Sequence, residues 1–202
     1  GHLTDYIIIE TMKPKECRVF FKAKADLKHP NTMKLLAFNK EDELLGEMTV
    51  YSVGGGAILI EGEECGEGQD VYPHHSLKEI QEYCFAKEME LWEYVDAFDP
   101  MDDYIEKIME QMMATVESGL SKEGVLPGDL HLERIAKELK DKADSCKSAV
   151  EKEKLLLSAY AYAASEENAG GSMTVTAPTL GSSGILPSLV TYYHKDLGYE
   201  KE

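Results

Sequence analysis

The stretch DPMDDYIEKIMEQMMATVESG, residues 99–119, decides the fold class of this 202-residue chain. Asp99, Pro100 and Asp102 are typical of a helix start, and Gly119 is typical of a helix end. Between them, apolar residues recur at helical spacing, namely Tyr104, Ile105, Ile108, Met109, Met112, Met113 and Val116. This period predicts one long amphipathic helix, whose methionine-rich stripe packs into a core rather than around a cofactor.

The residues on either side continue this pattern, so the second half of the chain is predicted to be all-helical. Upstream, Ser76 and Glu79 form a capping box ahead of a helix over residues 77–87. Downstream, a turn over residues 124–128 is followed by three further helical periods, at 132–139, 155–164 and 185–195.

The first 64 residues differ, because their apolar residues form short alternating runs that predict strands. These strands are expected at residues 17–25, 33–38, 47–53 and 57–60, while the apolar run at 6–10 fits either a strand or a helix start. A run rich in Glu and Gly from Gly62 to Asp70 indicates a linker. The predicted fold class is α+β, with three parts: a small N-terminal mixed α/β domain (1–64), a linker (65–72) and a mostly α-helical domain (73–202).

Bulk composition excludes several classes of function. The formal net charge of −17 opposes binding to nucleic acid and to anionic membrane surfaces. The sequence has no run of about 18 apolar residues, so no transmembrane helix is expected, and no signal peptide is visible. The cysteines are scattered without a Cys-x-x-Cys pair, which favours reduced structural thiols in a cytoplasmic protein; they are Cys17, Cys65, Cys84 and Cys146.

A long segment between two predicted helices, SEENAGGSMTVTAPTLGSSGILP (165–187), is rich in glycine, proline and hydroxyl side chains. Ordinary connections in compact domains have about 4–6 residues. Backbone N–H groups and hydroxyls in such a segment can hold a small anion, and an acidic residue can hold an ammonium group. The alternative is structural. In it, Glu166 and Glu167 are charges on a helix surface, and the hydroxyl side chains cap the following helix, namely Thr176, Thr179, Ser182 and Ser183.

Two features of the first half also admit two interpretations each. Gly54, Gly55 and Gly56 lie between predicted strands, where glycines commonly form a hairpin or a bulge. Together with Ser52 they can instead form a nest for a carboxylate. His29 precedes a proline and is expected in an extended or turn conformation, where it is either simply exposed or serves as a general base or an orienting donor.

Five stretches stand out together because of their order along the chain. Four are Gly-His-Leu-Thr-Asp at 1–5, His-Pro-Asn-Thr-Met at 29–33, Tyr-Ser-Val-Gly-Gly-Gly at 51–56 and Gly-Val-Leu-Pro-Gly at 124–128. The fifth contains Glu-Glu-Asn-Ala-Gly-Gly, Thr-Ala-Pro-Thr and Gly-Ile-Leu-Pro, within residues 165–187. In this order they resemble the signature of the iron–sulfur-dependent bacterial L-serine dehydratases, with Leu3 in place of a glycine. The resemblance indicates a beta-type domain fused to the start of an alpha-type catalytic domain.

This resemblance implies a lyase that converts L-serine to pyruvate and ammonia by β-elimination. It also implies a four-iron four-sulfur cluster, whose open iron acts as a Lewis acid on the serine hydroxyl while a protein base takes the α-proton. The Ser-x-Lys-x-Arg-Gly element of the pyridoxal-dependent serine dehydratases does not occur in the sequence. No pyridoxal phosphate is therefore expected.

The resemblance further assigns roles to individual residues. His29 and His2 are expected to be catalytic and to handle protons. Two glycine-rich patches, one from each half of the chain, are expected to converge on one pocket for a small zwitterion. The expected substrate contacts are Asn31, Ser52, Gly54, Gly55, Gly56, Glu167, Asn168, Thr176, Thr179, Gly181 and Ser182.

A departure from the family pattern bears on the cofactor. Ser183 stands where many single-chain members carry a cluster-ligating cysteine, and the resemblance places the remaining ligands beyond residue 202. This chain is therefore expected not to hold the cluster alone, and its helical domain is expected to be incomplete at the C-terminus. The alternative function is a non-catalytic amino-acid-binding or partner subunit. Both functions predict a homo- or hetero-oligomer with a small amino-acid ligand and no nucleic-acid or membrane partner.

Overall fold

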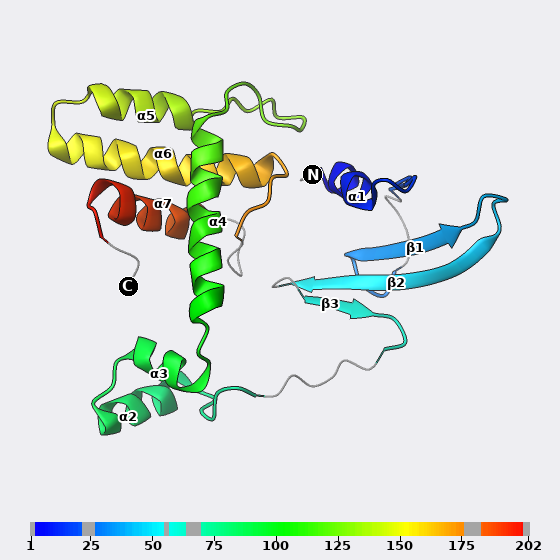
Figure 1. Ribbon diagram of the computed structural model, residues 1–202, viewed down its shortest axis with the longest axis horizontal. Coiled ribbons are helices and arrows are strands. Elements are labelled where there is room, and N and C mark those ends of the chain that lie inside the picture. Colours follow the sequence, from blue (N-terminus) through cyan, green and yellow to red (C-terminus); the bar gives the residue numbers. More distant parts are fainter. Residues whose placement is uncertain (1–2, 22–26, 55–56, 64–69, 176–182, 200–202) are drawn as a thin grey trace.

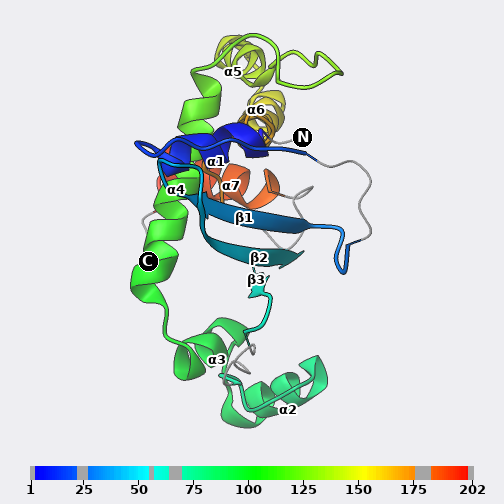
Figure 2. The same ribbon diagram turned by 90° about the vertical axis from the view of Figure 1, so that its right-hand side faces the viewer.

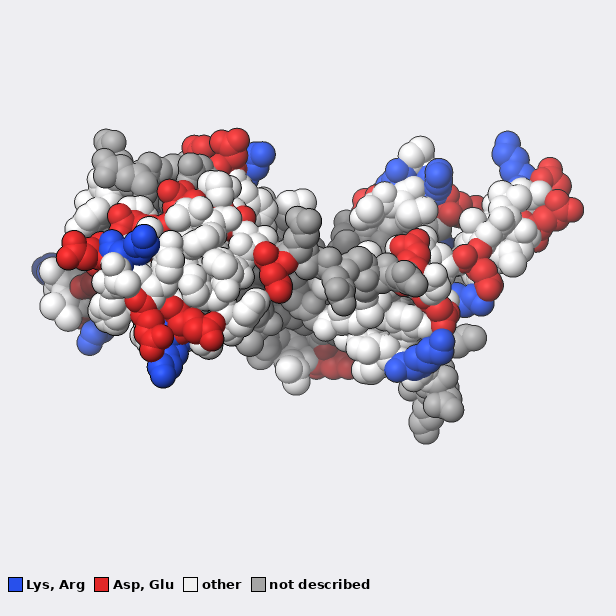
Figure 3. Space-filling model, turned by 90° about the horizontal axis from the view of Figure 1, so that it is seen from below, with Lys and Arg blue, Asp and Glu red and all other residues white. Residues whose placement is uncertain are grey.

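The computed structural model describes residues 3–21, 27–54, 57–63, 70–175 and 183–199. It shows an N-terminal part with a small sheet and a C-terminal part of packed helices (Figure 1, Figure 2), which confirms the predicted α+β fold class. Acidic side chains are spread over the face that Figure 3 shows, in keeping with the net charge of −17. None of the described helices is both long and apolar enough to cross a membrane.

The N-terminal part contains one helix and one antiparallel sheet. Helix α1 (Thr4–Met12) settles the open choice at residues 6–10 in favour of a helix. Strands β1 (Thr32–Phe38), β2 (Leu44–Gly54) and β3 (Ala57–Ile60) follow, and the sheet has the order β1-β2-β3. Three of the four predicted strands are thereby confirmed.

The fourth predicted strand, at residues 17–25, is wrong over residues 17–21, which form neither strand nor helix. Residues 22–25 lie outside the described residues. Phe20 and Phe21 are 81% and 73% exposed. An alternating pattern makes a strand only where a neighbouring strand takes up its backbone hydrogen bonds, and the described sheet ends at β1.

The C-terminal part is built around two long helices, α4 (Asp102–Leu120) and α6 (Ala149–Ala169). The shorter helices α5 (Ala136–Ser145) and α7 (Ile185–Thr191) pack against α6. A π-helical turn over Tyr192–Asp196 continues α7. These helices confirm the all-helical reading of the second half of the chain.

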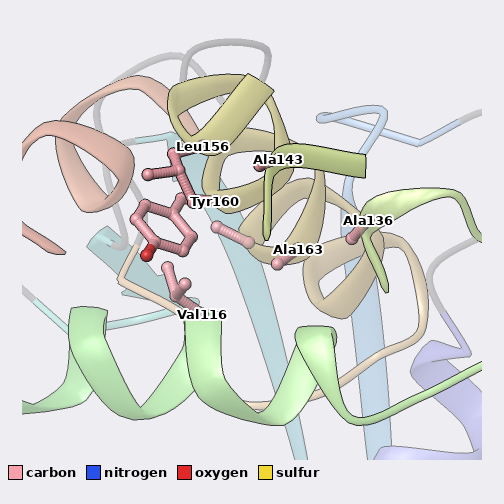
Figure 4. Close-up of a cluster of buried hydrophobic side chains, with 7 residues drawn as sticks. Val116, Ala136, Ala143, Leu156, Tyr160 and Ala163 are labelled. Atoms are coloured by element: carbon pink, nitrogen blue, oxygen red, sulfur yellow. The ribbon is translucent and has the colours of Figure 1, made fainter. Parts of the chain in front are cut away.

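Small side chains make up most of the helical core and let the helices approach closely (Figure 4). A Cβ atom on Gly119 of α4 would lie 2.4 Å from the carbonyl oxygen of Ala163 in α6, so only glycine fits at this crossing. Gly184, next to α7, would meet the carbonyl oxygen of Ala161 at the same distance. The buried cluster consists of Val116, Ala136, Ala143, Leu156, Tyr160, Ala163 and Ala164.

The predicted core stripe of α4 is buried over only part of the helix. Met112 and Val116 are buried, which confirms the prediction for the C-terminal half. Tyr104 and Ile105 are 60% and 46% exposed, because the N-terminal half of α4 projects beyond α5, α6 and α7 (Figure 1). For Tyr104 and Ile105, the prediction of a core position is wrong, while Ile108 and Met109 are half-buried.

Helices α2 (Leu77–Lys87) and α3 (Leu91–Phe98) lie beyond the projecting end of α4 (Figure 1). The predicted cap of α2 is confirmed, because the Ser76 hydroxyl accepts the Glu79 N–H at 3.3 Å. The two helices are joined by a cluster of rings: Tyr72, His74, Tyr83, Tyr94 and Phe98.

Candidate functional site

The sheet brings two of the sequence motifs together. Thr32 at the start of β1 pairs with Tyr51 near the end of β2. The Ser52 N–H donates to the Asn31 carbonyl at 3.0 Å. The His-Pro-Asn-Thr-Met and Tyr-Ser-Val-Gly motifs therefore lie side by side, at the end of the sheet that is nearer to the helical part (Figure 1).

His29 is held in a defined orientation by its own turn. Its Nδ1 accepts the Asn31 N–H at 3.1 Å, and its carbonyl accepts the Thr32 hydroxyl at 2.6 Å. The ring lies edge-on to Tyr51, with 6.3 Å between the ring centroids. Because Nδ1 is occupied as an acceptor, the neutral ring carries its proton on Nε2. In this arrangement His29 offers an N–H donor rather than a free lone pair.

Lys28, Tyr51 and Glu61 form a polar group beside His29 that the sequence analysis missed. Lys28 Nζ lies 2.6 Å from Glu61 Oε1. Hydrogen bonds from Lys28 and Tyr51 lower the pKa of Glu61, while burial, followed by the bond to Glu61, raises the pKa of Tyr51. The hairpin register was the available signal, because Glu61 directly follows β3, the strand that pairs with Tyr51.

The C-terminal end of α6 carries two buried carboxylates in succession. Glu166 and Glu167 are 3% and 1% exposed, so their interpretation as helix-surface charges is wrong. Glu167 Oε2 accepts from Lys122 Nζ at 2.5 Å and from the Ser118 hydroxyl at 2.8 Å. Its Oε1 accepts from the Arg134 guanidinium at 2.9 Å. Burial raises the pKa of Glu167, but these hydrogen bonds outweigh it and lower the pKa to about 2.

Glu166 uses its carboxylate differently, at the start of α5. Its Oε1 accepts the N–H groups of Ile135 at 2.7 Å and Ala136 at 3.1 Å. A carboxylate in this place satisfies free N–H groups and complements the positive end of the helix dipole. The other oxygen, Oε2, has no hydrogen-bond partner among the described residues and lies 3.8 Å from the Arg134 guanidinium. Glu166 therefore fixes α5 to the end of α6.

Arg134 reaches these carboxylates from an arm between α4 and α5. The arm begins with the predicted turn at 124–128 and closes where the Arg134 N–H donates to the Gly124 carbonyl at 2.8 Å. Because the Leu132 carbonyl is hydrogen-bonded within this arm, the helix predicted from residue 132 begins only at Ala136. The turn motif thus serves to deliver Arg134 to the end of α6.

The two glycines that follow α6 fit around Arg134. A Cβ atom on Gly170 would lie 2.8 Å from the Arg134 guanidinium, so Gly170 makes room for that side chain. Gly171 has a φ of 76°, a conformation that glycine adopts without strain. The Ser172 N–H then donates back to the Glu167 carbonyl at 3.0 Å. The Asn-Ala-Gly-Gly element is therefore a tight turn built against Arg134.

One face of α4 carries polar residues that the sequence analysis missed. Gln111 Nε2 donates to the Met173 carbonyl at 3.1 Å and also to the Thr115 hydroxyl at 3.1 Å. That hydroxyl donates to the Gln111 carbonyl at 2.7 Å and lies 3.3 Å from the Met173 carbonyl oxygen. Ser118 continues this row, and Lys122 follows it just beyond the end of α4; both bind the buried carboxylate described above. Their spacing of four, three and four residues is helical, but the apolar period on the neighbouring face masked it.

The described site residues form two groups. The first lies at the end of the sheet and contains His29, Asn31, Ser52 and Gly54. In the second, Glu167 and Asn168 lie at the end of α6, and Ser183 is buried ahead of α7. The convergence of both groups on one pocket stays a prediction, because it depends on residues outside the described ones: His2, Gly55, Gly56, Thr176, Thr179, Gly181 and Ser182.

The described cysteines do not fit an iron–sulfur cluster. Cys17 follows α1, Cys84 is buried within α2, and Cys146 caps the end of α5. Cluster ligation needs several thiolates around one centre. Across the residues that the structure describes, no three His, Cys, Asp or Glu side chains come together in a way that could hold a metal ion.

Comparison with known protein families agrees with this arrangement of parts. The family described as serine dehydratase alpha chain matches residues 74–202. The family described as serine dehydratase beta chain matches residues 9–63. The chain therefore belongs to the serine dehydratase family, which confirms the resemblance found in its motifs.

Individual relatives point the same way. The chain is 34% identical over 189 residues to an L-serine dehydratase of Helicobacter pylori, covering 86% of this chain and 42% of that protein. It is 34% identical over 187 residues to L-serine dehydratase 1 of Escherichia coli, covering 82% of this chain and 39% of that protein. An L-serine dehydratase of Streptomyces coelicolor is 33% identical over 193 residues, 87% of this chain and 41% of its own length. The chain thus spans about two fifths of the length of these relatives.

Proposed function

We propose that this chain is part of an L-serine dehydratase. The enzyme removes the α-proton and the β-hydroxyl of L-serine as water, and the resulting aminoacrylate hydrolyses to pyruvate and ammonia. Family membership supports the reaction. The structural observation that carries the proposal is the pairing of the His-Pro-Asn-Thr-Met and Tyr-Ser-Val-Gly motifs, which gathers a histidine, an amide and a hydroxyl at one end of the sheet.

In this proposal the end of the sheet binds and orients the substrate. His29 donates through its Nε2–H to an oxygen of the bound serine, since its Nδ1 is already engaged by the turn. Asn31, Ser52 and the glycines from Gly54 onward hold the substrate carboxylate by hydrogen bonds. Asn168 approaches from the end of α6. Orienting the substrate in this way lowers the entropic part of the barrier.

The family uses a four-iron four-sulfur cluster, which serves in these enzymes as a Lewis acid toward the serine hydroxyl. The described residues do not provide its ligands. We therefore propose that the thiolates come from other residues of the enzyme. The proposed organisation is a beta-type domain at 1–64, a linker at 65–72 and an alpha-type domain at 73–202, in an oligomeric cytoplasmic enzyme.

The test compares two histidine variants of the complete enzyme, prepared without oxygen and assayed for pyruvate formed from L-serine. The variant His29→Ala is expected to lower kcat/KM by about 10²–10³-fold, the usual loss when one positioned hydrogen-bond donor is removed. His75→Ala is the matched control, because the His75 side chain is exposed near α2. Unchanged turnover in His29→Ala would remove this residue from the mechanism, and wild-type enzyme without serine turnover would refute the function.

One observation favours a second candidate, a non-catalytic amino-acid-binding subunit: the described residues hold no metal-binding group. Purification of the protein without oxygen distinguishes the two functions. Iron, sulfide and serine turnover in the product support the enzyme. A colourless protein that binds L-serine without converting it supports the binding subunit.

A further inference from the structure

The connection that leaves α6 is fastened to the rest of the helical part at two places. At its base, the Glu167 carboxylate is bound by Arg134 and Lys122, and the Glu167 carbonyl accepts the Ser172 N–H. One residue further on, the Met173 carbonyl is bound from α4. Few loops are fastened in this way, because connections on a protein surface usually satisfy their backbone groups with water.

The contacts at the base leave Glu167 fully engaged. Each carboxylate oxygen already accepts a hydrogen bond from a cation, and the side chain is only 1% exposed. A substrate ammonium group could bind Glu167 only by displacing Arg134 or Lys122, which would leave a buried charge uncompensated. The geometry therefore gives Glu167 a different role from the direct substrate contact expected from the sequence.

We infer that Arg134 and Thr115 are positioning residues, which set the place of Asn168 and the Gly170–Val175 connection through Glu167 and the Met173 carbonyl. This inference rests on the proposed function, because Asn168 and the glycine-rich connection are its expected substrate contacts. Arg134 acts at the base of the connection. Thr115 acts from α4, where its hydroxyl accepts from Gln111 Nε2 at 3.1 Å and so holds the amide that donates to the Met173 carbonyl. A fixed connection binds serine more tightly because less conformational entropy is lost on binding.

Two variants test the two fastenings separately in the complete enzyme prepared without oxygen. Arg134→Lys keeps the charge. A lysine ammonium, however, lacks the planar fork with which Arg134 binds Glu167 through one nitrogen and packs beside Gly170 with the other. Thr115→Val keeps the shape and removes the hydroxyl. The matched control is Thr191→Val, because Thr191 is a buried threonine whose hydroxyl has no hydrogen-bond partner in the described part of the chain.

We expect both variants to raise the KM for L-serine by about tenfold, with a smaller change in kcat, because they loosen binding without touching a reacting group. Hydrogen–deuterium exchange at the amides of residues 170–175 should become faster in both variants. The control Thr191→Val should change neither quantity. If Glu167 instead bound the substrate ammonium directly, Thr115→Val would leave KM unchanged, and that result would overturn the inference.

The exchange measurement separates this inference from the proposed function. Wild-type enzyme without serine turnover would refute the proposed function, and the exchange rates would then decide the inference alone. Faster exchange at residues 170–175 in Arg134→Lys and Thr115→Val, but not in Thr191→Val, would support the positioning role. Exchange that is unchanged in both variants would overturn it, whatever the activity.

Discussion

The N-terminal part and the end of α6 differ in how far their ion pairs are exposed to solvent. In the N-terminal part, ion pairs such as Lys34–Glu47 and Arg18–Glu16 lie in solvent, and Val50 is buried while most apolar side chains of the strands are exposed. In the helical part, a carboxylate and a guanidinium are buried together, with Glu167 1% and Arg134 9% exposed at the side chain. The end of α6 therefore depends on matched buried charges, whereas the described sheet depends on backbone pairing.

This difference matters for function because a buried charge tolerates only one arrangement. Surface ion pairs contribute little and can shift without cost, so they cannot hold a loop in one place. A buried carboxylate that loses a partner is strongly destabilised, so its partners and everything attached to them stay in register. The end of α6 is thus suited to fix the connection that follows it.

The largest expected effect comes from removing one member of the buried pair. Arg134→Ala leaves Glu167 with Lys122 and a hydroxyl, and should lower the free energy of unfolding by about 3–5 kcal/mol. Arg18→Ala removes an exposed partner of Glu16 and should leave the urea midpoint unchanged. Urea unfolding curves of both variants measure the difference. Equal losses in the two variants would contradict the contrast between the two parts.

The pH dependence of stability should also reveal the buried charge of Glu167. The folded-state pKa of Glu167, about 2, lies below the ordinary value of 4.5. The stability from Glu167 is therefore fully present above pH 4.5 and is lost as the pH falls toward 2. Because one pKa unit corresponds to about 1.4 kcal/mol, this contribution is about 3 kcal/mol.

The free energy of unfolding, measured between pH 6 and the acid limit, tests this contribution by comparison with two variants. Glu167→Gln should flatten the acid dependence below pH 4.5, because the titrating carboxylate is gone. Glu61→Gln is the control from the sheet. The pKa of Glu61 is also lowered, by its hydrogen bonds with Lys28 and Tyr51, but this carboxylate is exposed, so the variant should keep the acid dependence of the wild type. An acid dependence as steep in Glu167→Gln as in the wild type would show that Glu167 does not carry it.

Sequence patterns predicted the elements that depend on local periodicity. The alternating runs identified β1, β2 and β3, and the 3.6-residue period identified α4 and α6. The failures arise where distant partners decide the outcome. Residues 17–21 alternate but have no neighbouring strand in the described sheet, and the N-terminal half of α4 carries apolar residues at helical spacing but projects from the bundle.

The site shows the same division between local and distant information. The motifs located the His29 turn and the end of β2, and the register of the sheet then brought them together. The burial of Glu167 could not be predicted, because its partners Lys122 and Arg134 lie 45 and 33 residues away in sequence. Nothing local distinguishes a glutamate that faces solvent from one that faces two cations across a helix crossing.

The smallest expected effect on stability comes from replacing one glycine in each part, Gly119 in α4 and Gly46 in β2. Gly119→Ala places a Cβ against the backbone of Ala163, a clash that outweighs the gain of about 1 kcal/mol in helix propensity, for a net loss of about 1–2 kcal/mol. Gly46→Ala in β2 meets no atom within 4 Å and should leave stability unchanged or slightly raised, because alanine loses less backbone entropy. Thermal unfolding of both variants measures this difference. Equal stability of the two variants would mean that α4 and α6 separate at little cost, and would leave the close crossing of these helices without a role in holding Ser118 against Glu167.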